Sequence, residues 1–281
     1  MQLSEEMRKQ LQQRLLQMLK VFHRVCEEHG IRYYMNSGTM LGAIRHKGFI
    51  PWDDDVDLGM FRKEYDQLLS LPKEVWGADY ELITFHNTKG YPYCFAKLYD
   101  KNSTIVEDGY AKTVGGIYLD IFPHDGAGNH LSTAKLRYRR NFIQYWLLIY
   151  RLLEEKKQNP VKKLLQQWAH TRSVHAWQNK LERRIRELDC DDCVYVSNYI
   201  GRHRTKEVFP KEYFGTPTLY EFEDMQLYGP ERATEYLTWL YGDFMKLPPE
   251  EERGLNHPAQ LIDLELPYRE YLKKNNKESK I

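Results

Sequence analysis

GFIPWDDDVDLG, at residues 48–59, places four carboxylates within five positions and is the stretch from which the fold can be inferred. Neighbouring carboxylates repel one another unless cationic groups lie between them, so the run is typical of a divalent-metal site. On an extended segment, Asp55 and Asp57 would point to one face, and the apolar residues that alternate with them would point into a core. A solvated acidic turn is the alternative, but a turn does not need this apolar alternation.

The residues before the acidic run add a candidate phosphate-binding segment. NSGTMLGAIRHK, at residues 36–47, contains a Ser-Gly turn followed by a helix-compatible stretch and a basic triplet. Such a turn would let backbone N–H groups approach a phosphate at the start of a helix, and the triplet adds up to three positive groups. The candidate substrate-binding residues of this segment are Ser37, Gly38, Thr39, Arg45, His46 and Lys47.

The whole stretch SGTMLGAIRHKGFIPWDDDVD, at residues 37–57, resembles the LicD family, a branch of the nucleotidyltransferase fold that includes the fukutin-related proteins. The resemblance resumes at GIYLDIFPHD, residues 116–125, and more loosely at YGDFMKLPP, residues 241–249. It implies an α+β fold in which a nucleotidyltransferase-like mixed β-sheet core carries three aspartates, with an added helical subdomain.

The family pattern pairs two carboxylates across one apolar residue and adds a third on a neighbouring strand. Asp55 and Asp57 fit the pair, and Asp120, between two apolar residues, fits the third. The resemblance makes these three the candidate catalytic residues and the candidate ligands of Mg²⁺ or Mn²⁺. Asp120 would either complete the metal coordination or accept the proton of the attacking hydroxyl. An aspartate in a turn at the end of a strand is the remaining interpretation.

Three further residues are candidates for contact with the substrate. Asp53 lacks the apolar alternation and is ranked as a supporting residue. Lys97, in the strand-like segment 93–100, would place a point charge on a phosphate, or would be a surface lysine. His124 follows Asp120 by four residues, where the strand is expected to give way to a loop, and would contact substrate or serve in a turn.

The resemblance implies a metal-dependent phosphotransferase for substituted phosphate groups. The favoured reaction moves phosphocholine from CDP-choline to a hydroxyl of a lipid-linked glycan such as teichoic acid or lipopolysaccharide. Metal ions and cationic side chains would offset charge on the phosphoryl oxygens. CDP-ribitol or CDP-glycerol would suit the same core, and a nucleotidyltransferase that releases pyrophosphate would use the same aspartates. A catalytically silent glycan-binding protein is disfavoured because the acidic and basic residues are retained.

Composition bounds the remaining possibilities. The chain has 281 residues and 41 basic against 40 acidic side chains, a net charge of +1, which gives no reason to expect nucleic-acid binding. A single domain over residues 1–270 is expected, with a helical insertion at about 132–188 and a disordered tail at 271–281. The 21 tyrosines and six tryptophans would supply faces for sugar rings or a choline-like cation, besides filling the core.

The sequence predicts a cytoplasmic protein. Residues 1–20 are charged and have a helical pattern, without the apolar region of a signal peptide. Cys26, Cys94, Cys190 and Cys193 show no disulfide framework. The last two form a single C-x-x-C, interpreted as reduced thiols in preference to half of a zinc site or a redox pair.

Residues 137–153 bear on membrane contact. Basic residues precede an aromatic and aliphatic run that is too short to cross a bilayer. The pattern suits either a buried core helix, which is the preferred interpretation, or an interfacial helix on an anionic membrane. The second would place the protein at the inner face of the cytoplasmic membrane.

Overall fold

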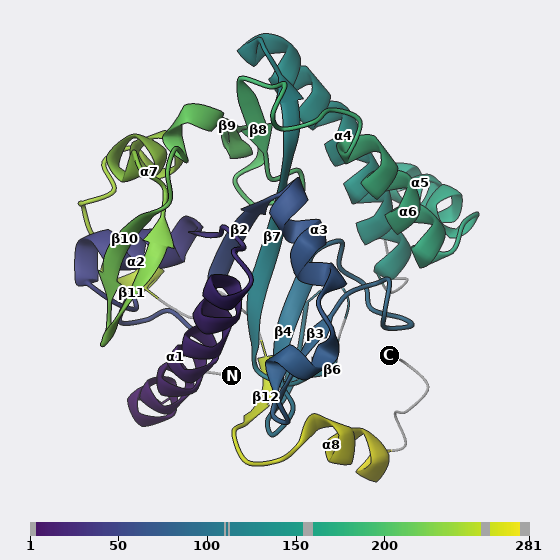
Figure 1. Cartoon of the computed structure of the whole chain (residues 1–281). Helices are drawn as coiled ribbons and strands as arrows, with labels where there is room; N and C mark the ends of the chain where they lie inside the picture. Colours follow the sequence, from purple (N-terminus) through teal and green to yellow (C-terminus); the bar gives the residue numbers. More distant parts are fainter. Residues whose placement is uncertain (1–3, 110, 112, 154–159, 254–258, 276–281) are drawn as a thin grey trace.

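The computed structural model describes residues 4–109, 111, 113–153, 160–253 and 259–275. In this part of the chain the central sheet contains seven strands, and Figure 1 shows it in the middle of the molecule with helices around it. Its strands are β1 (Tyr34–Met35), β2 (Asp57–Phe61), β3 (Tyr80–Ile83), β4 (Ala96–Asp100), β7 (Tyr118–Gly128), β8 (Tyr195–Ser197) and β9 (Val208–Pro210).

The long strand β7 organises this sheet. Its first half lies between β2 and β4 in the order β1-β2-β7-β4-β3, and its last residues pair with β8, which pairs with β9. β2 runs parallel to β7, whereas the other pairs of this sheet are antiparallel. The mixed sheet with its separate helices confirms the α+β class.

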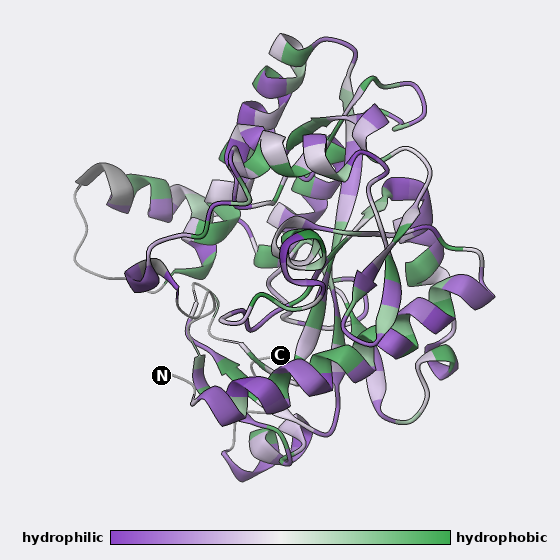
Figure 2. Cartoon of the chain, turned by 90° about the vertical axis from the view of Figure 1, so that its left-hand side faces the viewer, coloured by the Kyte–Doolittle hydropathy of each residue, from purple (hydrophilic) through white to green (hydrophobic). Residues whose placement is uncertain are grey.

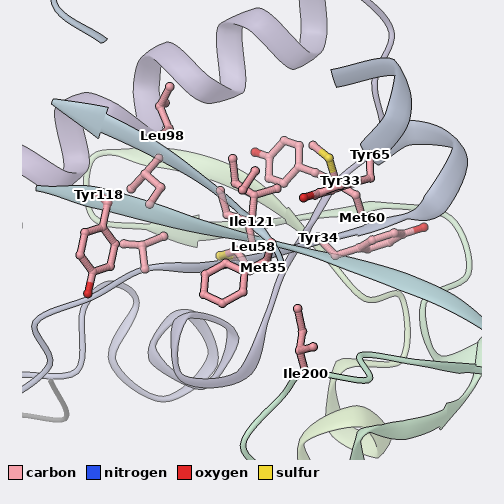
Figure 3. Close-up of a cluster of buried hydrophobic side chains, with 14 of the residues drawn as sticks. Tyr33, Tyr34, Met35, Leu58, Met60, Tyr65, Leu98, Tyr118, Ile121 and Ile200 are labelled. Atoms are coloured by element: carbon pink, nitrogen blue, oxygen red, sulfur yellow. The ribbon is translucent and has the colours of Figure 1, made fainter. Parts of the chain in front are cut away.

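Strand alternation gives this sheet one strongly apolar face. Leu58 pairs with Ile121, Leu98 pairs with Leu119, and all four side chains are completely buried. Figure 3 shows Leu58 and Ile121 within a cluster of buried side chains. Because successive residues of a strand point to opposite faces, the positions between these leucines and isoleucine point away from that cluster.

Helices pack around the sheet with their apolar sides inward. The first helix buries Leu11, Leu15, Met18 and Phe22, and Figure 2 shows hydrophilic and hydrophobic patches alternating along it. Ser4 caps this helix by accepting a hydrogen bond from an N–H of its first turn. The helices are α1 (Glu5–Glu28), α2 (Ser37–His46), α3 (Arg62–Ser70), α4 (Leu131–Leu152), α5 (Pro160–His170), α6 (Val174–Ile185), α7 (Ala233–Tyr241) and α8 (Tyr268–Lys274).

Two smaller sheets complete the described structure. A hairpin is formed by β10 (Thr218–Phe222) and β11 (Met225–Gly229), and a three-stranded sheet by β12 (Ala259–Asp263), β5 (Thr104–Glu107) and β6 (Val114–Gly115). Short 3₁₀ helices are η1 (Lys73–Trp76), η2 (Arg204–Glu207), η3 (Lys211–Tyr213) and η4 (Glu250–Glu252).

Three expectations about organisation can be compared with these elements. Helices α4 to α6 cover residues 131–185 with gaps, close to the segment of about 132–188 that was expected to be helical. The expectation of a disordered tail from residue 271 is wrong for its first residues, because α8 extends to Lys274 and buries Leu272. The rest of that tail, residues 276–281, lies outside the described residues. Among the described helices, none combines the length and the apolar character that crossing a bilayer would require.

Helix α2 packs closely against the loop that leads into the acidic run. A Cβ atom at Gly42 would lie 2.4 Å from the carbonyl oxygen of Gly48. The helix ends at Lys47 in a left-handed conformation, φ 61°, and the Lys47 carbonyl accepts a hydrogen bond from Glu223 N–H (2.7 Å). The Glu223 carboxylate accepts another from Phe49 N–H (2.9 Å). The β10–β11 turn therefore holds this loop in place.

Gly42→Ala tests this close approach. Helix propensity alone would make the variant more stable by about 1 kcal/mol. The contact with the Gly48 backbone instead predicts a loss of about 1–3 kcal/mol in the free energy of unfolding, measured by urea denaturation. Gly109→Ala is the control, because a Cβ there would meet nothing within 4 Å. A Gly42→Ala variant as stable as the parent would contradict the packing.

Candidate functional site

Three of the predicted site residues lie side by side on adjacent strands. Asp57 of β2 is the register partner of Asp120 of β7, and Asp120 is the register partner of Lys97 of β4. Side chains at paired positions point to the same face, on backbones about 4.8 Å apart. Lys97 Nζ lies 3.3 Å from Asp120 Oδ1. The sheet therefore presents two carboxylates and one ammonium group in a row, which we call the 57–120–97 row.

The 57–120–97 row lines a cavity of about 870 Å³. The Asp53 carboxylate packs against the first turn of α2, 3.1 Å from where a Cβ of Gly38 would lie. The predicted site residues that line this cavity are Ser37, Gly38, Arg45, Asp53, Asp55, Asp57, Lys97 and Asp120. The structure thus brings together most of the residues inferred from sequence, from segments spread between residues 37 and 120.

The start of α2 is fixed against the start of β2. Thr39 Oγ1 accepts a hydrogen bond from Asp57 N–H (2.8 Å), and Asn36 N–H donates to the Asp57 carbonyl oxygen (3.0 Å). Ser37 N–H donates to Tyr236 Oη (3.0 Å). Thr39 is absent from the cavity lining, and its hydroxyl fixes the backbone of Asp57 at the start of β2. The first turn of a helix has N–H groups without intrahelical acceptors, and this one lines the cavity.

The acidic run itself forms a potential metal site. Asp53, Asp54 and Asp55 place oxygen atoms within 4.8 Å of one another. The predicted set of Asp55, Asp57 and Asp120 forms no such group among the described residues. Asp53, Asp54 and Asp55 can converge because residues 53–56 precede β2 in irregular backbone, where consecutive side chains need not alternate between two faces. Carboxylate oxygens are suitable ligands for Mg²⁺ or Mn²⁺.

Lys97 is buried, so the interpretation as a surface lysine is wrong. Its side chain is 2% exposed and its Nζ lies 3.2 Å from Glu107 Oε1, on β5. The Nζ also lies 3.1 Å from the ring centre of Tyr118 and 4.7 Å from that of Tyr93. This ammonium group is therefore shared between two carboxylates inside a box of aromatic rings.

Glu107 holds the far side of this box and was not identified from sequence. It accepts hydrogen bonds from Tyr118 Oη (2.8 Å), Tyr93 Oη (3.0 Å) and the Thr113 hydroxyl. Burial raises the pKa of Glu107, but Lys97 and the hydrogen bonds outweigh burial and bring it below its usual value. Glu107 is thus a charged partner of Lys97. Its only signal in the sequence was an acidic residue at the end of an apolar strand.

Of the basic triplet at residues 45–47, Arg45 lines the cavity and His46 and Lys47 do not. Successive residues of a helix are rotated by about 100°, so three consecutive side chains cannot share one direction. Arg45 Nη1 donates to the Phe244 carbonyl oxygen (3.0 Å), and Lys47 Nζ lies 3.9 Å from Glu221. The expectation that His46 and Lys47 contact substrate is not supported by these positions.

His124 also lies away from the cavity lining. β7 continues to Gly128, so the loop expected at this point is not there. The imidazole is 1% exposed and packs against the rings of Phe61, Phe209 and Phe214. Burial lowers the pKa of His124 to about 3, so the ring is neutral. Its position gives no support to the expected contact with substrate.

Other lining residues were not named as candidate site residues from the sequence. Glu207 of η2 is 1% exposed, Tyr145 comes from α4, and Tyr241 ends α7. Tyr241 opens the loosely matching stretch 241–249, and much of that stretch lines the cavity. These residues come from the second half of the chain and are joined to the site only by folding.

The C-x-x-C pair is not part of the site. Cys190 and Cys193 are free and buried, and neither belongs to a potential metal cluster of described residues. Burial raises the pKa of Cys190 to about 12, and its Sγ lies 3.2 Å from the His124 carbonyl oxygen. Cys190 is therefore a protonated, structural thiol.

Comparisons with known proteins agree with the motifs. The family described as LicD/FKTN/FKRP, nucleotidyltransferase domain, matches residues 30–151. The chain is 33% identical over 250 residues to the lipopolysaccharide cholinephosphotransferase LicD of Haemophilus influenzae, covering 86% of this chain and 92% of that protein. It is 50% identical over 40 residues to the human ribitol 5-phosphate transferase FKRP, 14% of this chain and 8% of that protein. To the mouse ribitol-5-phosphate transferase FKTN it is 36% identical over 52 residues, 18% and 11% respectively.

Lys97→Met tests the buried charge cluster. Removing the ammonium leaves Glu107 and Asp120 buried beside each other, so the free energy of unfolding should fall by about 3–5 kcal/mol in urea denaturation. Adding Glu107→Gln should restore part of the loss, because one uncompensated charge is removed. Lys73→Met, at an exposed position, is the control. A loss below about 1 kcal/mol for Lys97→Met would mean that the cluster does not hold these charges together.

Proposed function

The chain belongs to the LicD family, and from this premise we propose that it transfers a phosphorylated alcohol to a hydroxyl of a cell-surface glycan. The observation that carries the proposal is the 57–120–97 row, which lines one cavity together with the first turn of α2. We further propose that this arrangement is a nucleotidyltransferase-like core whose aspartates carry the chemistry.

Phosphate groups would bind at the first turn of α2. The N–H groups and dipole of the turn attract an anion, and Arg45 adds a positive charge on the cavity wall. The side chain of Arg45 is anchored by its hydrogen bond to the Phe244 carbonyl, so its position is set before a substrate arrives. These groups would hold the diphosphate of the donor over the aspartates.

The acidic run would hold a divalent ion, Mg²⁺ or Mn²⁺, through Asp55 and Asp57, with Asp53 beside them. A bound ion supplies neutralisation of the charge on the phosphoryl oxygens. The attacking glycan hydroxyl forms a new bond to phosphorus, the bond from phosphorus to the nucleotide oxygen breaks, and CMP leaves. Asp120 is our candidate for either a further metal ligand or the acceptor of the hydroxyl proton. Lys97 Nζ, 3.3 Å from Asp120 Oδ1, would hold that carboxylate in position.

Phosphocholine from CDP-choline is the favoured transferred group. The relative whose similarity spans most of both chains is named a cholinephosphotransferase, whereas the similarity to the ribitol-phosphate transferases is confined to short segments. Ribitol phosphate or glycerol phosphate from a CDP-polyol is the alternative. The released nucleotide separates both from a nucleotidyltransferase proper, which would release pyrophosphate from CTP.

We also propose that α4 and α5 rest on an anionic membrane surface where a lipid-linked acceptor would be presented. On α4, Leu136 and Ile143 are 64% and 59% exposed, and Trp146 is exposed on the same side. Leu164 and Trp168 of α5 are 67% and 50% exposed. Basic residues on the same stretch of α4, such as exposed residues 139 and 140, complement anionic headgroups. This position would lie at the cytoplasmic side of the inner membrane.

The first experiment on function measures nucleotide release from CDP-choline, CDP-ribitol, CDP-glycerol and CTP, with Mg²⁺ or EDTA and a glycolipid acceptor. We expect EDTA-sensitive release of CMP, fastest from CDP-choline. Asp57→Asn and Asp120→Asn should each lower the rate by about 100-fold or more. Asp57→Asn should do so without loss of stability, because it relieves carboxylate repulsion, whereas Asp120→Asn also removes one of the two carboxylates beside Lys97. Asp192→Asn, at an exposed position, is the control. A near-parental rate in either active-site variant would remove that residue from the chemistry.

The membrane proposal is tested by cosedimentation with vesicles. Vesicles that contain phosphatidylglycerol should bind the protein, and phosphatidylcholine vesicles should bind it much less. Ile143→Glu should weaken binding by about tenfold, because burying one such side chain contributes about 1.5–3 kcal/mol. Gln226→Glu introduces the same charge at an exposed strand position away from α4 and serves as control. Equal binding of both variants would contradict docking through α4.

A further inference from the structure

Glu207 is a buried carboxylate whose second oxygen has no hydrogen-bond partner. Its Oε1 accepts a hydrogen bond from His203 N–H (3.1 Å), whereas Oε2 is buried and has none. Burial raises the pKa of Glu207 to about 7, and the hydrogen bond from His203 lowers it by a smaller amount. A carboxylate in this state has a large unmet capacity to bind a cation.

The carboxylate is held firmly in place. A Cβ at Gly201 would lie 2.3 Å from the Glu207 carboxyl carbon, so the backbone there passes directly over it. Asn198 N–H donates to the Glu207 carbonyl oxygen (3.2 Å), and the Gly201 carbonyl accepts from Tyr138 Oη (3.3 Å). Glu207 and Gly201 both line the cavity that contains the 57–120–97 row. The fold therefore holds the buried Glu207 carboxylate at the wall of the cavity, although burying this group is unfavourable.

Aromatic residues accompany this carboxylate. Tyr145 of α4 and Tyr241 of α7 line the same cavity. The pKa of Tyr241 is raised by burial and also by the charges of Asp57, Glu207 and Asp53. Tyr241 is therefore close enough to both the acidic run and Glu207 for their charges to affect its hydroxyl. It lines the same cavity as the aspartates and Glu207.

A carboxylate with aromatic rings is the chemistry that binds a quaternary ammonium group. Such a cation cannot donate a hydrogen bond, and it gains attraction from ring faces and from a full negative charge. A carboxylate with aromatic rings also surrounds the ammonium group of Lys97, which lies among aromatic rings beside Glu107. The box around Lys97 is filled by its own cation, whereas Glu207 lines the cavity and its Oε2 has no partner among the described residues.

We infer that Glu207, with Tyr145 and Tyr241, binds the trimethylammonium group of the donor. This inference rests on the proposed function, because it requires a cationic alcohol as the transferred group. It assigns the preference for choline over a neutral alcohol to the second half of the chain, apart from the aspartates that act on phosphorus. A proton acceptor for the attacking hydroxyl is the other role that a buried carboxylate could have here, and the test separates the two.

The test compares CDP-choline with its isostere, in which a carbon atom replaces the choline nitrogen and removes the charge. Both ligands have the same shape and the same diphosphate, so the ratio of their dissociation constants reports the cation site alone. In calorimetry with the parent protein we expect CDP-choline to bind at least tenfold more tightly than the isostere. Glu207→Gln should reduce that ratio to about one, whereas Glu235→Gln, at an exposed position of α7, should leave it unchanged.

Failure of the inference and failure of the proposed function give different results. A parent protein that binds neither ligand, or that binds CDP-ribitol more tightly, would contradict choline-phosphate transfer itself. A parent preference for CDP-choline that survives in Glu207→Gln would overturn the cation site. Loss of turnover with both ligands at an unchanged binding ratio would make Glu207 a proton acceptor and would also overturn it.

The pH dependence of the parent protein provides a second measurement that needs no variant. Charged Glu207 should bind the cation, so the CDP-choline preference should rise about tenfold between pH 6 and pH 8. Neighbouring groups with a shifted pKa move away from that range: burial and nearby cations lower the pKa of His203 to about 4, and burial raises the pKa values of Tyr138, Tyr236 and Tyr241. The other charged groups nearby, Arg202, Arg204 and Lys206, are basic side chains. A preference that is flat across this range would contradict the inference.

Discussion

The register of β2 against β7 places the carboxylates of Asp57 and Asp120 side by side. The electrostatic repulsion between these two carboxylates is the constraint on which the rest of the site depends. Two such charges about 5 Å apart repel by about 3 kcal/mol at an effective dielectric constant of about 20. Lys97 offsets that cost from the third strand, and it is itself held by Glu107 and a box of aromatic rings. The three-stranded sheet is thereby coupled to the central sheet through a buried charge.

Local sequence features build this arrangement without special geometry in the strands. Apolar residues alternate with the functional ones, so burying Leu58 and Ile121 on one face forces Asp57 and Asp120 onto the other. The α2 helix is brought to the same place by Thr39, which accepts from the Asp57 N–H. Packing and polar contacts thus position the first turn of α2 relative to the aspartates.

The sequence predicted what is encoded locally and missed what depends on distant contacts. Alternation was enough to place Asp57 on the face opposite the core, whereas the choice of Asp120 and the α+β class came from the resemblance to the LicD family. The convergence of Asp53, Asp54 and Asp55 depends on irregular backbone that alternation does not predict. His124 was misplaced because β7 is longer than expected. Glu207 lies 150 residues after Asp57, so only the folded chain shows that both line one cavity.

The position of the divalent ion tests the role of the acidic run most directly. Crystals grown with Mn²⁺ and CDP-choline would allow the ion to be located by its anomalous scattering. We expect the strongest peak in direct contact with a carboxylate oxygen of Asp55 or Asp57 and with the diphosphate of the donor. An ion bound at another acidic cluster, or a diphosphate bound away from the first turn of α2, would contradict the assignment of this cavity as the site of phosphoryl transfer.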